Sequence, residues 1–427
     1  MPEKKQNKDE ELDKLLSTKV ERLKKLDILD DDDVLKDLDA EIKKPKEEEE
    51  QEQEQEQKQA GTVPAQKEIP EGEQGIKTLL ETPNIKQLDK KIESAPEALP
   101  TGTPLKQEMK QIEFADRTQE YLNQTEGDYD RAVLLVKDLY HNIASGKQLN
   151  NRDILQLIKS FIKVLINDQC IVINFSVYDP NPKDYLFHHA LNVSLLSMNI
   201  ATAMDYSEDQ ILQLGEAGMM ADLGMMLIDP GIRIKNGKLE SDEFYEVHKH
   251  PILGVAALER IKLMSELVAY VSYQHHERLT GAGYPKNRKG RIINRYTNIV
   301  SVADVLEALT SHRAYRPALH PASAMVQLVK MARVGFLSPD VVRQVLRFSS
   351  AYPVGCLIQL SNMCIAKVIQ PSEKHITKPI VSVVVDEKGK VLSRENIYQI
   401  DLSKQADVTV VKPVNYRDFK VNRMDGF

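Results

Sequence analysis

The chain has 427 residues, of which 41% are hydrophobic and 28% charged, enough for two or three domains and a sizeable core. A formal net charge of −7 and a pI near 5.9 argue against binding to a nucleic-acid polymer, which requires a basic surface. Cys170, Cys356 and Cys364 form no CxxC pair, which argues against a disulfide framework or a cysteine-rich zinc site. The N-terminus has no apolar signal segment, and no apolar run reaches the ~18 residues of a membrane span. We therefore expect a cytoplasmic location.

Residues 1–105 are expected to form a disordered, low-complexity tail. They contain "EEEEQEQEQEQ" (47–57), several prolines and few aromatic residues, and such a composition buries too little apolar area to offset the entropy of ordering. The segment "LDKLLSTKVERLKKLDIL" (12–29) has helical spacing, so a helix that forms on a protein partner is an alternative to a solvated tether.

Helical patterns occupy residues 106–350. The stretches "RAVLLVKDLYHNIASG" and "NNRDILQLIKSFIKVLIN" predict an N-terminal helical region over 106–180, followed by a helical domain over 181–350. Ser207 with Gln210 three residues later predicts a capping box, and Ser241 before two acidic residues predicts another helix start.

The period of the sequence changes in residues 351–427. "VGCLIQLSNMCIAKVIQ" and "KPIVSVVVDEKGKVL" alternate, are rich in valine and isoleucine, and are broken by turn residues, so we expect a small antiparallel β appendage of two or more hairpins. The predicted fold is mainly α, with a disordered N-terminal tail, an N-terminal helical region, a helical bundle and this C-terminal extension.

Histidine and aspartate gather on apolar helix faces between residues 188 and 320. Asp222 interrupts the apolar run "GEAGMMADLGMMLIDPGI" (215–232), and a buried carboxylate is costly unless it is paired or bound to a metal. The other candidates expected to turn inward are His189, His250, His275, His276 and Asp304. His250 precedes Pro251 and should lie at a helix end, whereas His188 and His248 are expected to be peripheral and solvated.

A single histidine on an apolar face is more often a hydrogen-bonded core residue than a ligand. Four histidines and two aspartates that point into one helical core are different, because they would be very costly unless they meet. Imidazole and carboxylate together suit Fe, Mn or Zn, and an aspartate can bridge two such ions. The pattern therefore predicts a divalent-metal site that contains Asp222.

The order and spacing of these segments resemble the HD-GYP family, the cyclic-di-GMP phosphodiesterases of the HD hydrolase superfamily. The resemblance runs from about residue 130 to 410. Its most specific stretch is "HHERLTGAGYPKNRKGRIINRYTNIVSVADVLEALTSHRAYRPA" (275–318), and "YPVGCLIQLSN" (352–362) resembles the β extension that often follows this domain. The resemblance implies an HD-type helical bundle.

The resemblance also implies roles for individual residues. It makes His189, Asp222, His250, His275, His276 and Asp304 the metal ligands. Gly283, Tyr284 and Pro285 would form the GYP loop that shapes the cyclic-dinucleotide pocket, and Arg313 and Arg316 would meet the phosphates. Independently, "KNRKGRIINR" (286–295) holds five basic residues and no acid, which suits phosphate contact, with an ordinary solvated loop as the alternative.

The chain departs from the family pattern at four positions. Ala221 stands where the family has the histidine of its His-Asp pair, and Met225 stands where the family has lysine. Thr280 replaces the usual aspartate at the start of the GYP loop, and Tyr185 stands where trinuclear members carry an acid. Loss of one such cationic donor typically lowers a rate by about 10²–10³. Asp222 would then remain as a weakened catalytic residue, and we expect weak or absent hydrolysis.

Three functions stay open from the sequence. The first is a degenerate HD-GYP protein that binds cyclic-di-GMP or a protein partner, the latter through the tail or the N-terminal helical region. The second is an active metal-dependent cyclic-di-GMP phosphodiesterase that uses the residual metal site, and the third is an interaction scaffold that binds no nucleotide. A single divalent ion, a larger set or none, and a homodimer or a monomer, are alternatives that the sequence does not separate.

Overall fold

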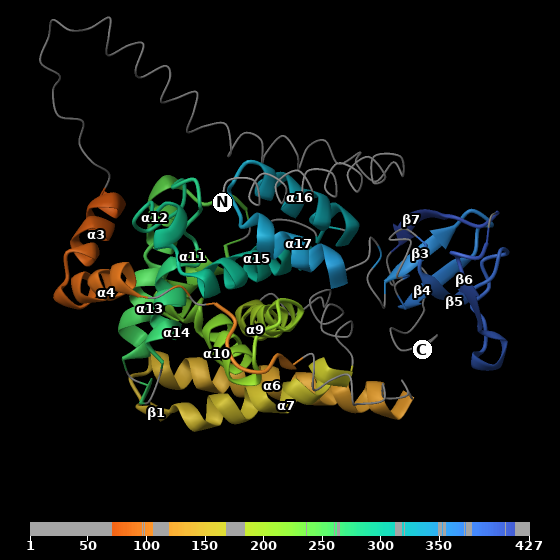
Figure 1. Ribbon diagram of the computed structural model, residues 1–427, viewed down its shortest axis with the longest axis horizontal. Helices are drawn as coiled ribbons and strands as arrows, with labels where there is room; N and C mark the ends of the chain where they lie inside the picture. Colours follow the sequence, from red (N-terminus) through yellow and green to blue (C-terminus); the bar gives the residue numbers. More distant parts are fainter. Residues whose placement is uncertain are drawn as a thin grey trace, which may run out of the picture.

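The fold is mainly α-helical with a small C-terminal β-sheet, as the sequence predicts (Figure 1). The computed structural model describes residues 71–95, 97, 99–105, 119–167, 184–235, 237–259, 261–262, 265–311, 318–319, 321–348, 352, 356–370, 372, 378–405 and 407–414. Residues 1–70 of the predicted tail, which include its low-complexity run and the helical spacing at 12–29, lie outside the described residues. In the described part, no helix is both long and apolar enough to cross a membrane.

Two short helices precede the N-terminal helical region, so the expectation of a disordered tail up to residue 105 is wrong for residues 71–94. They are α3 (Glu71–Leu80) and α4 (Pro83–Ser94), and Pro83 occupies the first turn of α4, where its missing N–H costs nothing. Ile85, Leu88 and Ile92 recur at helical spacing and pack against Tyr270 and Tyr273. A stripe of three apolar residues is too short to stand out from the polar sequence around it.

The N-terminal helical region consists of two long helices that lie below the central bundle in Figure 1. They are α6 (Gln119–Ala144) and α7 (Asn151–Asn167), with β1 (Leu149–Asn150) between them. Strand β1 pairs in parallel with β2 (Ile261–Lys262), which ties this region to the bundle. Helix α6 contacts α9 and α7 contacts α10.

The centre of the bundle is α9 (Tyr185–Ala203), which contacts α6, α10, α15 and α17. It is buried along nearly its whole length because other helices surround it, and most of its buried side chains are apolar. Its partners are α10 (Glu208–Met220) and α15 (Arg295–Thr310). The predicted capping box of Ser207 and Gln210 is confirmed at the start of α10.

Short helices complete the domain beside α10. They are η1 (Leu223–Leu227), α11 (Pro230–Arg233), α12 (Ser241–Val247), α13 (His250–Leu258), α14 (Glu266–Gln274) and η2 (Gly290–Ile292). Helix α12 begins at Ser241, as predicted, and Glu240 is its N-cap residue. His250 begins α13 immediately before Pro251, which confirms its prediction at a helix end.

The C-terminal part is a five-stranded antiparallel sheet in the order β6-β5-β4-β3-β7. It follows α16 (Pro321–Arg333) and α17 (Pro339–Phe348), and its strands are β3 (Leu357–Leu360), β4 (Ile365–Gln370), β5 (Ile380–Val385), β6 (Tyr398–Asp401) and β7 (Val410–Val414), with η3 (Arg394–Asn396) before β6. Val326 of α16 packs into the apolar cluster of this sheet. The predicted β appendage is confirmed.

Candidate functional site

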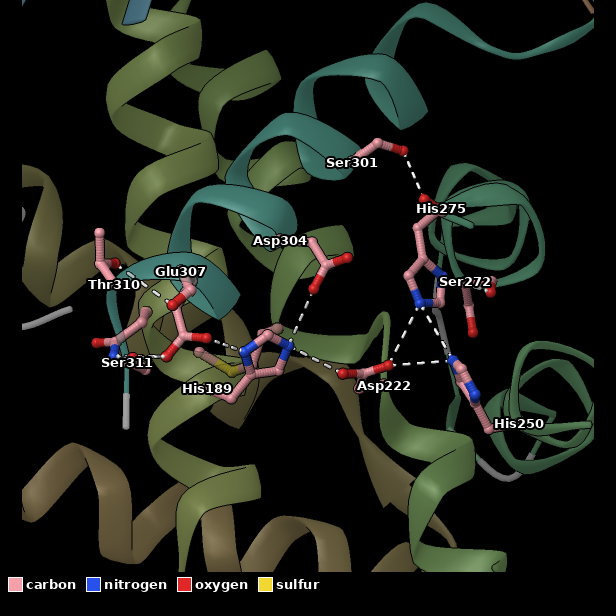
Figure 2. Close-up of polar contacts among 12 residues, drawn as sticks. His189, Asp222, His250, Ser272, His275, Ser301, Asp304, Glu307, Thr310 and Ser311 are labelled. Carbon is pink, nitrogen blue, oxygen red and sulfur yellow. Dashed lines mark hydrogen bonds and ion pairs between the residues drawn. The ribbon is translucent and has the colours of Figure 1, made fainter. Parts of the chain in front are cut away.

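Asp222 occupies the junction between α10 and η1, and its carboxylate turns toward three histidines (Figure 2). Its Oδ2 atom lies 2.9 Å from Nε2 of His189. Its Oδ1 atom lies 3.2 Å from Nε2 of His250 and 3.3 Å from Nε2 of His275. The apolar run that contains Asp222 therefore does not leave the carboxylate unpaired, because histidines from three other helices or helix ends surround it.

Six side chains form two donor groups that share Asp222. In the first, the four-donor group, the ligand atoms of Asp222, His250, His275 and His276 all lie within 4.8 Å of one another. In the second, the three-donor group, His189, Asp222 and Asp304 meet the same limit, with His189 Nε2 3.2 Å from Asp304 Oδ1. The structure brings together all six residues selected from the sequence, and their role as metal ligands stays a prediction.

The shared aspartate lies between the two donor groups. One carboxylate oxygen faces the four-donor group and the other faces His189 of the three-donor group. Mixed imidazole and carboxylate donors at this spacing fit Fe, Mn or Zn. The two groups are unequal, since the three-donor group has one imidazole where the four-donor group has three.

Backbone carbonyls orient two of the histidine rings. Nδ1 of His250 lies 2.7 Å from the carbonyl oxygen of Val247, and Nδ1 of His275 lies 2.9 Å from that of Ser272. With Nδ1 turned to a carbonyl, each ring presents Nε2 on its other side, protonated when it donates to Asp222 and as a lone pair only when it binds a metal ion. Both Nε2 atoms therefore point at Asp222.

The pKa values at the centre are shifted in different directions. Burial would lower the pKa of His189, but Glu307, Asp222 and Asp304 raise it well above its ordinary value. Burial alone would raise the pKa of Asp222, but hydrogen bonds with His189, His250 and His275 outweigh it and hold this pKa well below its ordinary value. Burial, together with the neighbouring His275 and His250, holds the pKa of His276 well below its ordinary value. An ionised carboxylate and a neutral imidazole are the forms that bind metal ions.

A close approach between two glycines places η1 against the start of α13. A Cβ atom at Gly224 would lie 2.0 Å from the carbonyl oxygen of His250 and 2.5 Å from the amide nitrogen of Gly254. A Cβ atom at Gly254 would lie 2.5 Å from Oγ of Ser272 on α14. Only glycine at these positions lets the segments that carry Asp222, His250 and His275 lie so close.

The predicted GYP loop lies beside the four-donor group. A Cβ atom at Gly283 would lie 2.3 Å from the carbonyl oxygen of His276, so this position also needs glycine. Pro285 is buried and follows a cis peptide bond after Tyr284. The ring of Tyr284 stacks on that of His276 at 4.6 Å and on that of His248 at 3.7 Å between centroids.

The sequence position of His248 suggested a solvated side chain, but the structure shows that it is not solvated. It is half-buried between Phe244, 3.9 Å away between ring centroids, and Tyr284. Burial, and the neighbouring His250, lower the pKa of His248 to about 4, so the ring is neutral near pH 7. The expectation was wrong because the helix face of His248 is covered by a loop that lies more than thirty residues later in the chain.

The basic segment 286–295 meets one acid from α4 and one that follows α4 in the chain. Arg288 is buried and forms an ion pair with Asp89 of α4, whose other carboxylate oxygen lies 3.3 Å from Nζ of Lys286. Nη1 of Arg295 lies 3.8 Å from Oε1 of Glu97. The buried ion pair of Arg288 differs from both expectations for the segment, a phosphate site and a solvated loop, whereas Lys289 and Arg291 are exposed. Arg313 and Arg316, the other predicted phosphate contacts, lie outside the described residues.

The departures at the family positions are visible in the structure. Ala221 is buried, and its carbonyl oxygen accepts a hydrogen bond of 3.2 Å from Ser272 Oγ, but its side chain offers no ligand atom. Met225 is half-buried against the main core, and its carbonyl oxygen accepts a 3.0 Å hydrogen bond from Arg233. The side chain of Thr280 is uncharged. Tyr185 is the first residue of α9 and packs against the same core.

Sequence reasoning missed three polar residues behind His189. Glu307 contacts Nδ1 of His189 and lies within 3.4 Å of Asn192, which in turn accepts a hydrogen bond of 2.9 Å from Tyr129. Spacing could have found two of them, because Glu307 is three residues after Asp304 and Asn192 three after His189, each on the same helix face. Tyr129 gives no such signal, since it lies in a different helix.

The comparisons identify two matched regions. Residues 180–341 match the family described as "HD domain", and residues 357–422 match the family described as "KOW domain associated with HD domain".

Three curated relatives match part of the chain. Cyclic di-GMP phosphodiesterase PA4108 of Pseudomonas aeruginosa is 29% identical over 224 residues, which cover 52% of this chain and 54% of the relative. Cyclic di-GMP phosphodiesterase PdeB of Borreliella burgdorferi is 21% identical over 238 residues, covering 56% and 62%. The 3'3'-cGAMP-specific phosphodiesterase 3 of Vibrio cholerae is 30% identical over 151 residues, covering 35% and 33%. The match thus spans less than two thirds of each of these relatives.

Proposed function

We propose, from the premise that residues 180–341 are an HD domain of the HD-GYP type, that this chain binds cyclic-di-GMP beside a divalent-metal site and hydrolyses it weakly or not at all. The observation that carries the proposal is the placement of Asp222 between a four-donor and a three-donor group. One group has a full set of ligands and the other lacks an imidazole, which supports metal binding more strongly than turnover.

The donor chemistry fits a divalent ion in the four-donor group. Asp222, His250, His275 and His276 supply one carboxylate and three imidazoles, and the burial of His250 and His275 excludes water from two of them. A bound ion would supply a Lewis acid that polarises a phosphodiester oxygen. Asp222 would hold its charge there because its pKa lies well below the ordinary value of a carboxyl group.

The proposal of weak hydrolysis rests on Ala221 and Met225. The three-donor group has no side chain at position 221 that could ligate, and position 225 carries a thioether in place of a charged amine. A cation aimed at the charge that develops on a departing oxygen typically contributes about 10²–10³ in rate. With one ligand and one cation missing, we expect the chain to retain binding and lose most of the rate.

Cyclic-di-GMP is the proposed ligand because two relatives carry its phosphodiesterase activity in their names, whereas the Vibrio cholerae relative is named for 3'3'-cGAMP. Isothermal titration calorimetry with each dinucleotide, on protein loaded with Mn²⁺, tests the proposal. We expect binding of cyclic-di-GMP and tighter binding than that of 3'3'-cGAMP. Absence of binding to either dinucleotide would favour the scaffold alternative.

A hydrolysis assay separates the first two functions. We expect the metal-loaded chain to convert cyclic-di-GMP at a rate indistinguishable from a metal-free blank or only slightly above it. The intact four-donor group favours the alternative of an active phosphodiesterase, and sustained turnover of many equivalents per chain would establish that alternative instead.

The double variant Ala221→His and Met225→Lys restores the two family residues. We expect it to bind more metal per chain and to hydrolyse cyclic-di-GMP at least ~10²-fold faster, because it regains a ligand and a cation. Ala221→Leu is the matched control, since leucine resembles imidazole in volume and cannot ligate. Unchanged metal content in the double variant, measured by elemental analysis, would contradict the role given to Ala221.

A further inference from the structure

His189 differs from the other two oriented histidines in what holds its ring. Nδ1 of His250 and Nδ1 of His275 meet backbone carbonyls, whereas Nδ1 of His189 meets the Oε2 atom of Glu307 (Figure 2). Glu307 lies on α15, 118 residues later in the chain, and only 2% of it is exposed. A buried carboxylate in this place has a specific consequence for the ring it faces.

Glu307 is itself held in place by further hydrogen bonds. Ser311 donates from Oγ to Oε1 of Glu307 at 2.6 Å, and Asn192 donates from Nδ2 to the same atom at 3.4 Å. The hydroxyl of Tyr129 donates to Oδ1 of Asn192 at 2.9 Å. Tyr129 lies on α6, so the contacts form a continuous chain from the N-terminal helical region to His189.

We propose that Glu307 is a positioning residue that holds His189 with Nε2 directed at the three-donor group, and that Asn192 and Tyr129 connect this position to helix α6. The inference rests on the metal site of the proposed function. A carboxylate that accepts the Nδ1 proton fixes which nitrogen carries the lone pair and makes the ring a stronger donor. A backbone carbonyl also fixes which nitrogen carries the proton, but it strengthens the ring as a donor less, because it carries no net charge.

The charged support from Glu307 acts on the three-donor group, which has fewer imidazole donors than the four-donor group. Position 221 offers no imidazole, so His189 is the sole nitrogen donor among the residues of the three-donor group. Its Nε2 lies 2.9 Å from Asp222 Oδ2 and 3.2 Å from Asp304 Oδ1, the distances of atoms that converge on one small volume. Removal of the Glu307 charge should therefore weaken this group and leave the four-donor group unchanged.

Glu307→Gln tests the inference, because it keeps the shape of the side chain and removes the charge. Metal affinity is measured by equilibrium dialysis with Mn²⁺ on the full chain, and ligand geometry is followed by the visible absorption of bound Co²⁺. We expect the weakest bound metal equivalent to lose about 10–100-fold in affinity, with a changed Co²⁺ spectrum. Glu307→Asp keeps the charge and should recover part of the affinity.

The matched control is Glu216→Gln. Glu216 is also 2% exposed and lies in the same bundle on α10, but it is in neither donor group. We expect this control to bind every metal equivalent with the affinity of the wild-type chain. Tyr129→Phe should reduce the weakest affinity by a few-fold, because it leaves Asn192 without its donor from α6, whereas Tyr206→Phe, at another buried tyrosine, should not.

Three outcomes decide the inference. A selective loss of affinity in Glu307→Gln, with normal thermal unfolding, supports it. Wild-type affinity for every equivalent in Glu307→Gln would overturn it and leave the proposed function intact. A wild-type chain that binds no metal would overturn both this inference and the metal site of the proposed function.

Discussion

Gly224→Ala should disrupt the contact between η1 and α13 that places Asp222 beside His250. The added Cβ atom would lie 2.0 Å from the carbonyl oxygen of His250 and 2.5 Å from the amide nitrogen of Gly254. Ordinary contacts of a Cβ atom begin near 3.4 Å, so the two segments must separate by about 1.4 Å at the closest point. Both obstructing atoms belong to the backbone and cannot rotate away.

The cost follows from this overlap. Overpacking a well-packed core costs about 1–3 kcal/mol, and a clash with backbone falls at the upper end or beyond it. We therefore expect the free energy of unfolding to fall by about 3 kcal/mol, which lowers Tm by roughly 3 °C if all 427 residues unfold together, at about 2.1 cal/mol/K per residue. The displacement also moves the ring of His250 away from Asp222, so we expect metal affinity to fall at least ~10-fold.

Urea denaturation and Mn²⁺ dialysis measure both effects. Gly127→Ala is the control, because a Cβ atom there would meet only Nη1 of Arg131 at 3.7 Å in helix α6. This control should gain about 0.5–1 kcal/mol, since alanine is favoured over glycine inside a helix. A Gly224→Ala chain with unchanged stability and unchanged metal affinity would refute the close approach of η1 and α13.

Two further predictions concern buried charges. Asp89→Asn leaves the buried guanidinium of Arg288 without its carboxylate, which should cost about 3 kcal/mol, so we expect limited proteolysis to cleave α3 and α4 before the bundle unfolds. Lys91→Ala breaks only an exposed ion pair and should not increase this cleavage. Equal cleavage of the two variants would contradict the role of Asp89. Burial, opposed by a hydrogen bond with Asn151, raises the pKa of Glu216 from 4.5 to about 7. The folded chain therefore keeps a proton that the unfolded chain loses above pH ~4.5, so this group's contribution to stability falls by ~3 kcal/mol as pH rises to about 7. Urea denaturation at pH 5 and pH 8 should show that decrease in the wild type relative to Glu216→Gln, and parallel pH profiles would count against it.

Residue identity and local spacing were enough to select the six donors. A carboxylate or imidazole on an apolar helix face is visible within one or two turns of sequence, as at Asp222, His189 and Asp304. The helix start at His250 followed from Pro251, and the capping box of α10 from Ser207. These signals are local, so they survive without knowledge of the fold.

The supporting contacts were not predictable in the same way. Arg288 and Asp89 are 199 residues apart, and His189 and Glu307 are 118 apart. The sequence shows that Arg288 is basic and Glu307 acidic, but not that each finds a buried partner from another helix. The expectation of phosphate contacts along 286–295 was reasonable from charge alone and did not account for α4.

The sequence by itself determined the helical bundle, the β appendage and the chemistry of the residues around Asp222, because periodicity, caps and residue type act over a few positions. Only the tertiary structure decided that α3 and α4 pack against α13 and α14, that His248 stacks on Tyr284, and that Glu307 supports His189. Such pairings depend on which surfaces meet when the apolar faces are buried, and no local pattern encodes the partner of a charge across a hundred residues.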